Sequence, residues 1–217
     1  MGFDREKFDE IKAAFTLDDD ALRSIADDFR ADMRAGLAGK KDATLRMLRS
    51  YTDLPSGKEH GAFLALDFGG TNVRAARILL RGGSAYEVLQ KVAKPLTMPG
   101  VYDQISADAT AEEMFDFLAE IIDEAIDGNR DTKYLLGHTF SFPSRQSNLY
   151  NAALITWTKE FATQGVEGKV VNDLLKEALL RRGMKNVTPV AVINDTVAVL
   201  LAAAYKHEHT YIGSIYA

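Results

Sequence analysis

The amino-acid sequence predicts an α/β fold in which a mixed sheet is flanked by helices. Three short apolar runs between Ala62 and Val92, separated by glycine-containing turns, indicate a β-meander. Apolar residues at helical spacing follow Thr110, where a capping signal begins. Farther along the chain, two more apolar strands alternate with two helical segments. Strands and helices interspersed in this way are typical of domains that mix both elements in layers.

The first 60 residues are expected to be mainly helical. Apolar residues recur at steps of three and four from Leu22 to Leu37, after an acidic run at 18–20 that suits a helix N-terminus. The Leu-Pro-Ser-Gly segment at 54–57 reads as a linker. A domain boundary is therefore expected near residue 60.

The meander is expected to contain three strands joined by two glycine turns, one at Gly69-Gly70 and one at 81–84. The predicted strands span Ala62–Leu66, Val73–Leu80 and Tyr86–Val92.

The helix after the meander carries a capping box, in which Glu113 follows the cap residue Thr110 by three positions. The remaining elements are predicted from apolar runs and their punctuation by proline, glycine and aspartate. They are a strand at Tyr134–Phe142, a helix at Val170–Arg182 closed by Gly183, a strand at Val187–Ile193, a helix from Asp195 to Tyr205, and a strand that begins at Tyr211–Ile215.

Composition narrows the function classes. The chain has 217 residues, of which 47% are hydrophobic, and a formal net charge of -5. This balance fits a globular protein and gives no electrostatic footprint for nucleic acid or an anionic membrane. Because the sequence contains no cysteine, disulfides and thiolate chemistry are excluded. With no apolar leader segment in the sequence, a cytoplasmic protein is expected.

The strongest motif is the glycine turn at residues 67–74 (DFGGTNVR). Glycines let a backbone approach a phosphate closely, and the turn would present N–H groups as an anion nest. Asp67 could hold a metal-bound water, and Arg74 adds a fixed positive charge. The plain alternative is a hairpin turn that uses glycine for positive φ. The Asp-Phe-Gly triplet also occurs in protein kinases, but their glycine-rich loop, lysine and HRD motif do not accompany it.

A second motif is Asn194-Asp195 at the end of a buried strand. A carboxylate there can take a proton from an alcohol that attacks phosphorus, whereas the plain alternative is that Asp195 caps the following helix. A third group combines the hydroxyl-rich segment at 137–143 with Trp157, Thr158 and Lys159. Hydroxyls with one lysine suit a polyol pocket, although tryptophan is more often a core residue.

Taken together, these segments resemble the hexokinase family, which includes glucokinase. The matching segments occur in the family's order: residues 67–74, then 139–146 (TFSFPSRQ), 154–168 (LITWTKEFATQGVEG) and 190–205 (VAVINDTVAVLLAAAY). The resemblance implies half of an actin/hexokinase-like (ribonuclease H-like) two-domain clamshell. It places residues 1–60 in the large domain, 61–193 in the small α/β domain, and 194–217 at the start of the large domain again.

The resemblance also implies roles for individual residues. Asp195 matches the catalytic base, and Lys159 would steady developing charge. The matched sugar contacts are Ser141, Phe142, Thr158, Lys159, Asn194 and Asp195. The matched ATP-phosphate segment is Asp67, Phe68, Gly69, Gly70, Thr71, Asn72 and Arg74, with Asp67 holding Mg²⁺ through water. The implied reaction is transfer of a phosphoryl group from ATP to the 6-hydroxyl of a hexose, with glucose the expected substrate.

The family's second phosphate loop, its sugar-binding glutamates and its adenosine pocket have no counterpart in this sequence. We therefore expect the chain alone to be inactive and to self-associate through apolar surface. Two other function classes remain open. A non-catalytic sugar sensor would be expected to lack Asp195 or Lys159, yet both are present. A general actin-like ATPase would lack the segment at 139–146.

Overall fold

The computed structural model describes residues 4–216, and the chain divides into two compact units after Arg49. The first unit contains two helices, α1 (Arg5–Ala14) and α2 (Asp19–Leu37). The predicted acidic helix start is confirmed, because the Asp18 carboxylate accepts the Ala21 N–H at 2.8 Å. The expected helices end earlier than residue 60, because the chain is irregular over 38–59, and the segment at 54–57 predicted as a linker lies in this part.

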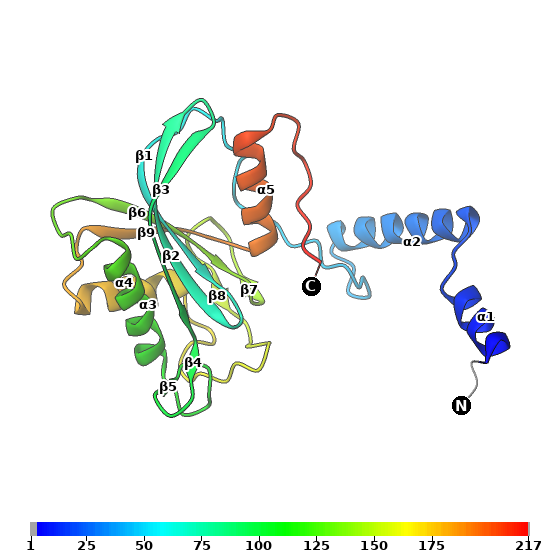
Figure 1. Ribbon diagram of the computed structural model, residues 1–217, viewed down its shortest axis with the longest axis horizontal. Helices are drawn as coiled ribbons and strands as arrows, with labels where there is room; N and C mark the ends of the chain where they lie inside the picture. Colours follow the sequence, from blue (N-terminus) through cyan, green and yellow to red (C-terminus); the bar gives the residue numbers. More distant parts are fainter. Residues whose placement is uncertain (1–3, 217) are drawn as a thin grey trace. The chain divides into compact units, whose positions relative to one another are not determined.

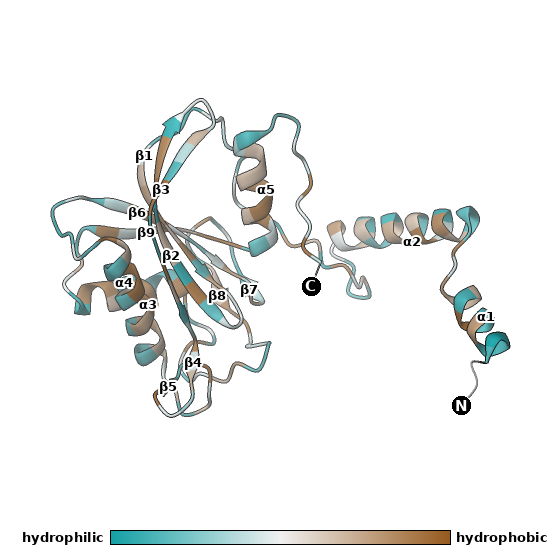
Figure 2. Ribbon diagram, in the orientation of Figure 1, coloured by the Kyte–Doolittle hydropathy of each residue, from teal (hydrophilic) through white to brown (hydrophobic). Residues whose placement is uncertain are grey.

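An apolar stripe runs along α2 (Figure 2). Leu22, Ile25 and Phe29 are each about half exposed on this stripe. The segment after the helix folds back onto it, because the Asp32 carboxylate accepts the Leu45 N–H at 2.8 Å. Within this first unit, the helix is therefore fixed locally by polar contacts, and the unit's own residues leave much of its apolar face uncovered.

The second unit is built on a five-stranded sheet (Figure 1). Its five strands are β1 (His60–Phe68), β2 (Asn72–Gly82), β3 (Ala85–Pro95), β6 (Tyr134–Phe140) and β9 (Val187–Ile193). Its helices are α3 (Ala111–Ala125), α4 (Val171–Arg181) and α5 (Asp195–Lys206). Two small strand pairs join β4 (Thr97–Met98) to β5 (Tyr102–Asp103) and β7 (Ser144–Arg145) to β8 (Ala153–Leu154).

The sheet is mixed, as predicted. Its strand order is β3-β2-β1-β6-β9, in which β1, β2 and β3 form the antiparallel meander and β1, β6 and β9 run parallel. The outer strand β3 carries a bulge where Gln90 pairs with Arg77 and Val88 pairs with Ile78. A bulge in an edge strand disturbs the regular ladder and so discourages further strand pairing.

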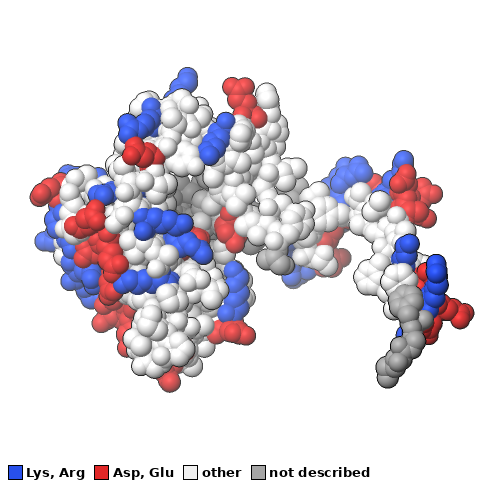
Figure 3. All heavy atoms as spheres, viewed as in Figure 1, with Lys and Arg blue, Asp and Glu red and all other residues white. Residues whose placement is uncertain are grey.

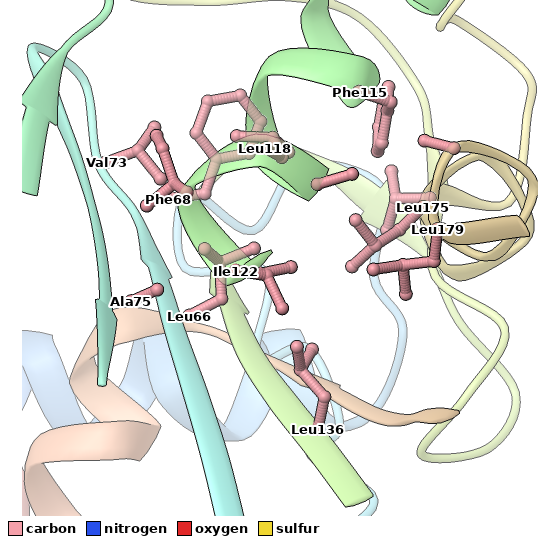
Figure 4. Packing of buried hydrophobic residues seen from close by; sticks show 14 of the residues in the cluster. Leu66, Phe68, Val73, Ala75, Phe115, Leu118, Ile122, Leu136, Leu175 and Leu179 are labelled. Carbon is pink, nitrogen blue, oxygen red and sulfur yellow. The ribbon is translucent and has the colours of Figure 1, made fainter. Parts of the chain in front are cut away.

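The core lies between one face of the sheet and the helices α3 and α4 (Figure 4). Alternate residues of the strands point into it, which follows from the two-residue period of a strand. From β1 these are Leu66 and Phe68, and from α3 Leu118 and Ile122 belong to the same core. All four are at most 1% exposed. Burying each such side chain stabilises the fold by about 1.5–3 kcal/mol. Figure 1 shows α5 on the opposite side of the sheet.

Most predicted elements are confirmed with shifts of a few residues at their ends. The capping box of α3 is present, with Thr110 and Glu113 bonded reciprocally. Gly183 adopts φ +76 after the last turn of α4, as its closing role requires. The predicted strand at Tyr211–Ile215 is wrong, because the segment is irregular and no described strand pairs with it.

Acidic and basic side chains interleave over the visible surface of the sheet unit (Figure 3). Many of them pair between elements: Arg181 with Asp116 at 2.7 Å, Arg182 with Asp123 at 3.0 Å. Exposed pairs of this kind contribute little each to stability. Among residues 4–216, no helix is both long and apolar enough to cross a bilayer.

Candidate functional site

Three sequence-predicted segments meet at one edge of the sheet. Parallel strands end on the same side, so the residues after β1, β6 and β9 lie together. The register makes Asp67 a neighbour of Thr139, and Thr139 a neighbour of Ile193. The glycine turn, the loop that starts at Ser141 and the Asn194-Asp195 pair therefore share one edge, although they lie far apart in the sequence.

The glycine turn does not use glycine for positive φ. The turn does join β1 and β2 as an antiparallel hairpin, but neither Gly69 nor Gly70 lies in the left-handed region, so the expectation of glycine for positive φ is wrong. Space favours glycine at position 69, because a Cβ there would lie 3.1 Å from the Asn72 carbonyl oxygen, whereas a Cβ on Gly70 would lie 3.4 Å from Lys159 Cδ, an ordinary contact with a flexible side chain. Within the described chain, the N–H groups of Gly70 and Thr71 donate no hydrogen bond. Two such amides at one turn are suited to binding an anion.

Asp67 is held from two sides. Thr139 donates its hydroxyl to Asp67 Oδ1 at 2.8 Å, and the Arg74 guanidinium lies 2.9 Å from Oδ2. Both members of the ion pair are nearly half exposed, so the carboxylate remains accessible to solvent. Thr139 thus positions the carboxylate from the neighbouring strand, a contact that sequence reasoning missed.

At the start of α5, the residue that caps the helix is Asn194 and not Asp195. Asn194 occupies the cap position, and its Oδ1 accepts the Thr196 N–H at 3.0 Å. Asp195 is the first helical residue; its Oδ1 also accepts the Thr196 N–H, at 2.8 Å. Its Oδ2 accepts no hydrogen bond from the described residues. The helix end is therefore capped by the neighbour, which leaves one carboxylate oxygen of Asp195 available.

Ser141 links the two halves of this edge. Its Oγ accepts the Asp195 N–H at 3.2 Å, so the loop after β6 contacts the residue after β9 directly. A serine hydroxyl that accepts one bond can still donate its own hydrogen. The Asn194 side chain can also donate: its Oδ1 already accepts from Thr196, while its Nδ2 has no acceptor among residues 4–216. Both residues can therefore donate to an oxygen-rich ligand.

Lys159 lies against the glycine turn. Its Cδ approaches Gly70, and its Nζ lies 5.4 Å from the centroid of the Phe142 ring. Lys159 and Glu160 both adopt positive φ, at 58° and 67°. Such a conformation is costly for residues with a Cβ and often marks a functional site. The structure thus brings Lys159 to the turn.

An aromatic cluster lies beneath these groups, formed by Phe68, Phe140, Phe142, Trp157 and Phe161. Phe68 is 1% exposed and Phe142 is 6% exposed, so their side chains are core groups. At these two predicted site positions, ligand contact could come mainly from the backbone. Thr158 is exposed beside Lys159, and its side chain has no hydrogen-bond partner in the described chain.

His138 is a second residue whose place sequence reasoning missed. It is 3% exposed, and its Nε2 lies 2.9 Å from Asn172 Oδ1. Asn172 in turn donates Nδ2 to the Tyr150 carbonyl at 2.9 Å. Burial lowers the pKa of His138 to about 4, and the bond to Asn172 opposes this only in part. The available signal was a polar residue at an inward position of a buried strand.

The edge fits a phosphate-bearing ligand better than a directly bound metal. No cluster of three or more histidine or acidic side chains able to hold a metal occurs among residues 4–216. A single accessible carboxylate beside unbonded amides fits a hydrated divalent cation that accompanies phosphate oxygens. Asp67 would contact the cation's water, and Gly70 and Thr71 would bind the phosphate.

Comparison with known proteins agrees with this geometry. The hexokinase family profile matches residues 7–205. Human hexokinase HKDC1 is 37% identical over 97% of this chain, and rat hexokinase-2 is 35% identical over 97%; the matches span 23% of each relative. A solved hexokinase has a TM-score of 0.77 at 37% identity, covering 88% of this chain and 45% of its own. The hexokinase of Schistosoma mansoni, solved with glucose, has a TM-score of 0.74 at 37% identity, covering 93% and 45%.

The chain thus spans under half the length of these relatives, and its fold corresponds to a domain fragment of the solved structures. The family profile covers most of the chain, and the sheet, its helices and the convergent edge agree with it. The chain belongs to the hexokinase family.

Proposed function

We propose that this chain contributes one side of a site at which a phosphoryl group passes from ATP to the 6-hydroxyl of a hexose, with glucose the favoured sugar. The observation that best supports this proposal is the contact of Ser141 with the Asp195 amide, at the sheet edge where the glycine turn also lies. An alcohol bound there would lie between hydroxyl and amide donors on one side and an anion-binding turn on the other.

Asp195 would act as the general base. Its free Oδ2 can accept the proton of the attacking hydroxyl, while the bonds made by its own N–H and by Oδ1 hold the residue in place. Ser141 and Asn194 would orient the sugar by donating to its hydroxyl oxygens. Lys159, close to Gly70, would offset negative charge that develops between sugar and phosphate.

Bound Mg-ATP would supply the phosphoryl group and neutralise part of its charge. The residues that would hold it here are Gly70 and Thr71 through their amides, and Asp67 through water. Arg74 and Thr139 keep the Asp67 carboxylate in position.

We further propose that the chain alone transfers no detectable phosphate. In-line transfer requires charged and polar groups that converge on the phosphates from both sides. The described residues offer one cluster, at one sheet edge. A coupled assay for glucose 6-phosphate, run beside light scattering on the purified chain, tests this together with the expected self-association. Robust turnover from a monodisperse monomer would contradict it.

The role of Asp195 is tested in a chain that continues through a second domain, as the solved hexokinases do. Asp195→Asn keeps the size of the side chain and removes the base, so turnover should fall by about two to four orders of magnitude. Glucose affinity should change much less. Asp173→Asn, which alters an exposed carboxylate on α4 bonded to Tyr150, is the matched control. Near-normal turnover of Asp195→Asn would exclude the assignment.

A further inference from the structure

The loop between Ser141 and Ile155 is fastened to the outer edge of β9. β9 is an end strand of the sheet, so one of its edges has no strand partner. Two residues of the loop bond to Val192 there: Gln146 donates Nε2 to the Val192 carbonyl at 3.1 Å, and the Leu149 carbonyl accepts the Val192 N–H at 2.9 Å. Val192 is 2% exposed, so water does not readily replace these bonds.

The loop itself is stiffened by reciprocal side-chain bonds. Asn151 Oδ1 accepts the N–H groups of Ser147 and Asn148, at 3.0 and 3.1 Å. Asn148 Oδ1 accepts those of Tyr150 and Asn151, both at 2.9 Å. The base of the loop is closed by the pairing of β7 with β8. A loop bonded in this way transmits the position of its attachment to its ends.

We propose that Gln146 is a positioning residue that aligns Ser141 with Asp195. Val192 is the second-last residue of β9 and lies three residues before Asp195, the first residue of α5, while Gln146 lies five residues after Ser141 in the loop. The Gln146–Val192 bond and the Ser141–Asp195 bond therefore join the same two segments at two points. With the first bond intact, the second keeps its geometry before any ligand arrives.

Lys159 is held by a different attachment. The segment that follows it bonds to the chain before α3: Ala162 donates its N–H to the Ile105 carbonyl at 2.7 Å, and Thr163 donates its hydroxyl to the Gln104 carbonyl at 2.8 Å. Lys159 thus has anchoring bonds of its own, although the Ile155 N–H also donates to the Pro143 carbonyl at 2.8 Å and so joins the start of its segment to the loop. Gln146 acts directly on the Ser141 side of this arrangement.

The inference rests on the proposed function, because aligning Ser141 with Asp195 matters only if a sugar binds there. Its first test, however, needs no ligand. Amide hydrogen exchange by NMR reads the Asp195 and Val192 N–H groups directly. Gln146→Met keeps the length of the side chain and removes the donor. Exchange of the Asp195 amide should rise about tenfold, the change expected for the loss of one hydrogen bond. Gln146→Lys, which keeps a donor at the end of the chain, should restore most of the protection.

The matched control is Asn186→Ala at the opposite end of the same strand. Asn186 also donates its amide to backbone carbonyls, those of Asn129 and Thr132, at 3.1 and 2.8 Å. Its loss should lower overall stability without selective exchange at Asp195. Unchanged Asp195 exchange in Gln146→Met, or an equal rise in Asn186→Ala, would overturn the inference.

Glucose titration of the same variants, followed by Trp157 fluorescence, separates this inference from the proposed function. If the unaltered chain binds glucose, Gln146→Met should bind it several-fold more weakly, while Asn186→Ala should bind as the unaltered chain does. If the unaltered chain binds no glucose, the titration is repeated in a chain that continues through a second domain. Failure there too would contradict the proposed sugar site, and the exchange result still decides the role of Gln146.

Discussion

Acidification should destabilise this fold through one buried histidine. His138 lies on β6, is 3% exposed, and its side chain contacts Asn172 of α4. Since Asn172 uses Nδ2 to donate to Tyr150, its Oδ1 must accept from His138, which places the imidazole proton on Nε2. Nδ1 then has no hydrogen-bond partner among the described residues. Protonation would place a positive charge on that buried atom.

The size of the effect follows from the pKa. An exposed histidine has a pKa of 6.5, and burial lowers the pKa of His138 to about 4. The unfolded chain therefore binds more protons than the folded one in this window, so stability falls as pH falls. The full loss, reached below pH 4, is about 3 kcal/mol, since each pKa unit corresponds to about 1.4 kcal/mol. At pH 5 about 2 kcal/mol should already be lost, a large part of a typical stability of about 5–15 kcal/mol.

Urea denaturation between pH 7 and pH 5, where few carboxylates titrate, measures this directly. His138→Gln keeps an amide donor for Asn172 but cannot be protonated, so its free energy of unfolding should change little over the window. His207→Gln removes an exposed histidine and should keep the slope of the unaltered chain. If His138→Gln loses as much stability as the unaltered chain does, the reasoning from burial is refuted.

Three further substitutions test other parts of the structure. Gly70→Val should weaken Mg-ATP binding more than glucose binding, because the added atoms meet Lys159; NMR titration with each ligand checks this, and equal effects would make the turn purely structural. Glu160→Gly should raise the free energy of unfolding by about 1 kcal/mol, since it relieves a positive φ; a loss in urea denaturation would contradict that. Thr110→Ala should lower it by about 1 kcal/mol by removing the cap of α3, and an unchanged thermal midpoint would show the cap to be dispensable.

Much of the sheet unit could be predicted from local patterns. Strand β9 is found at its predicted limits, because the apolar run is bounded by a glycine-containing turn before it and by Asn194 after it. The cap of α3 is visible in the spacing of Thr110 and Glu113 alone. These features depend on neighbours in the sequence. The segment at Tyr211–Ile215 has strand-like composition, but composition cannot supply the partner that a strand requires.

The sequence predicts which residues belong to the candidate site better than it predicts the contacts between them. Motif resemblance gave Ser141 and Asp195, yet the bond between them depends on the register of parallel strands, which no local pattern encodes. The closeness of Gly70 to Lys159 was likewise hidden, because the two residues lie far apart in the sequence. The contacts of His138 could not be predicted either, since its partner Asn172 lies 34 residues away and is brought to β6 only in three dimensions.

The long reach of the contacts at this edge also constrains how the protein can be made. The bond from Thr139 to Asp67 closes a separation of 72 residues, and that from Asp195 to Ser141 a separation of 54. High contact order slows folding, because loop closure must come before the contacts that reward it. During translation at about 5–20 residues per second, Asp195 is added roughly 6–25 s after Asp67. Until β9 emerges from the ribosome and joins β6, the edge beside the glycine turn of a nascent chain is incomplete, so a ligand that needs all three segments cannot assist the early steps of folding.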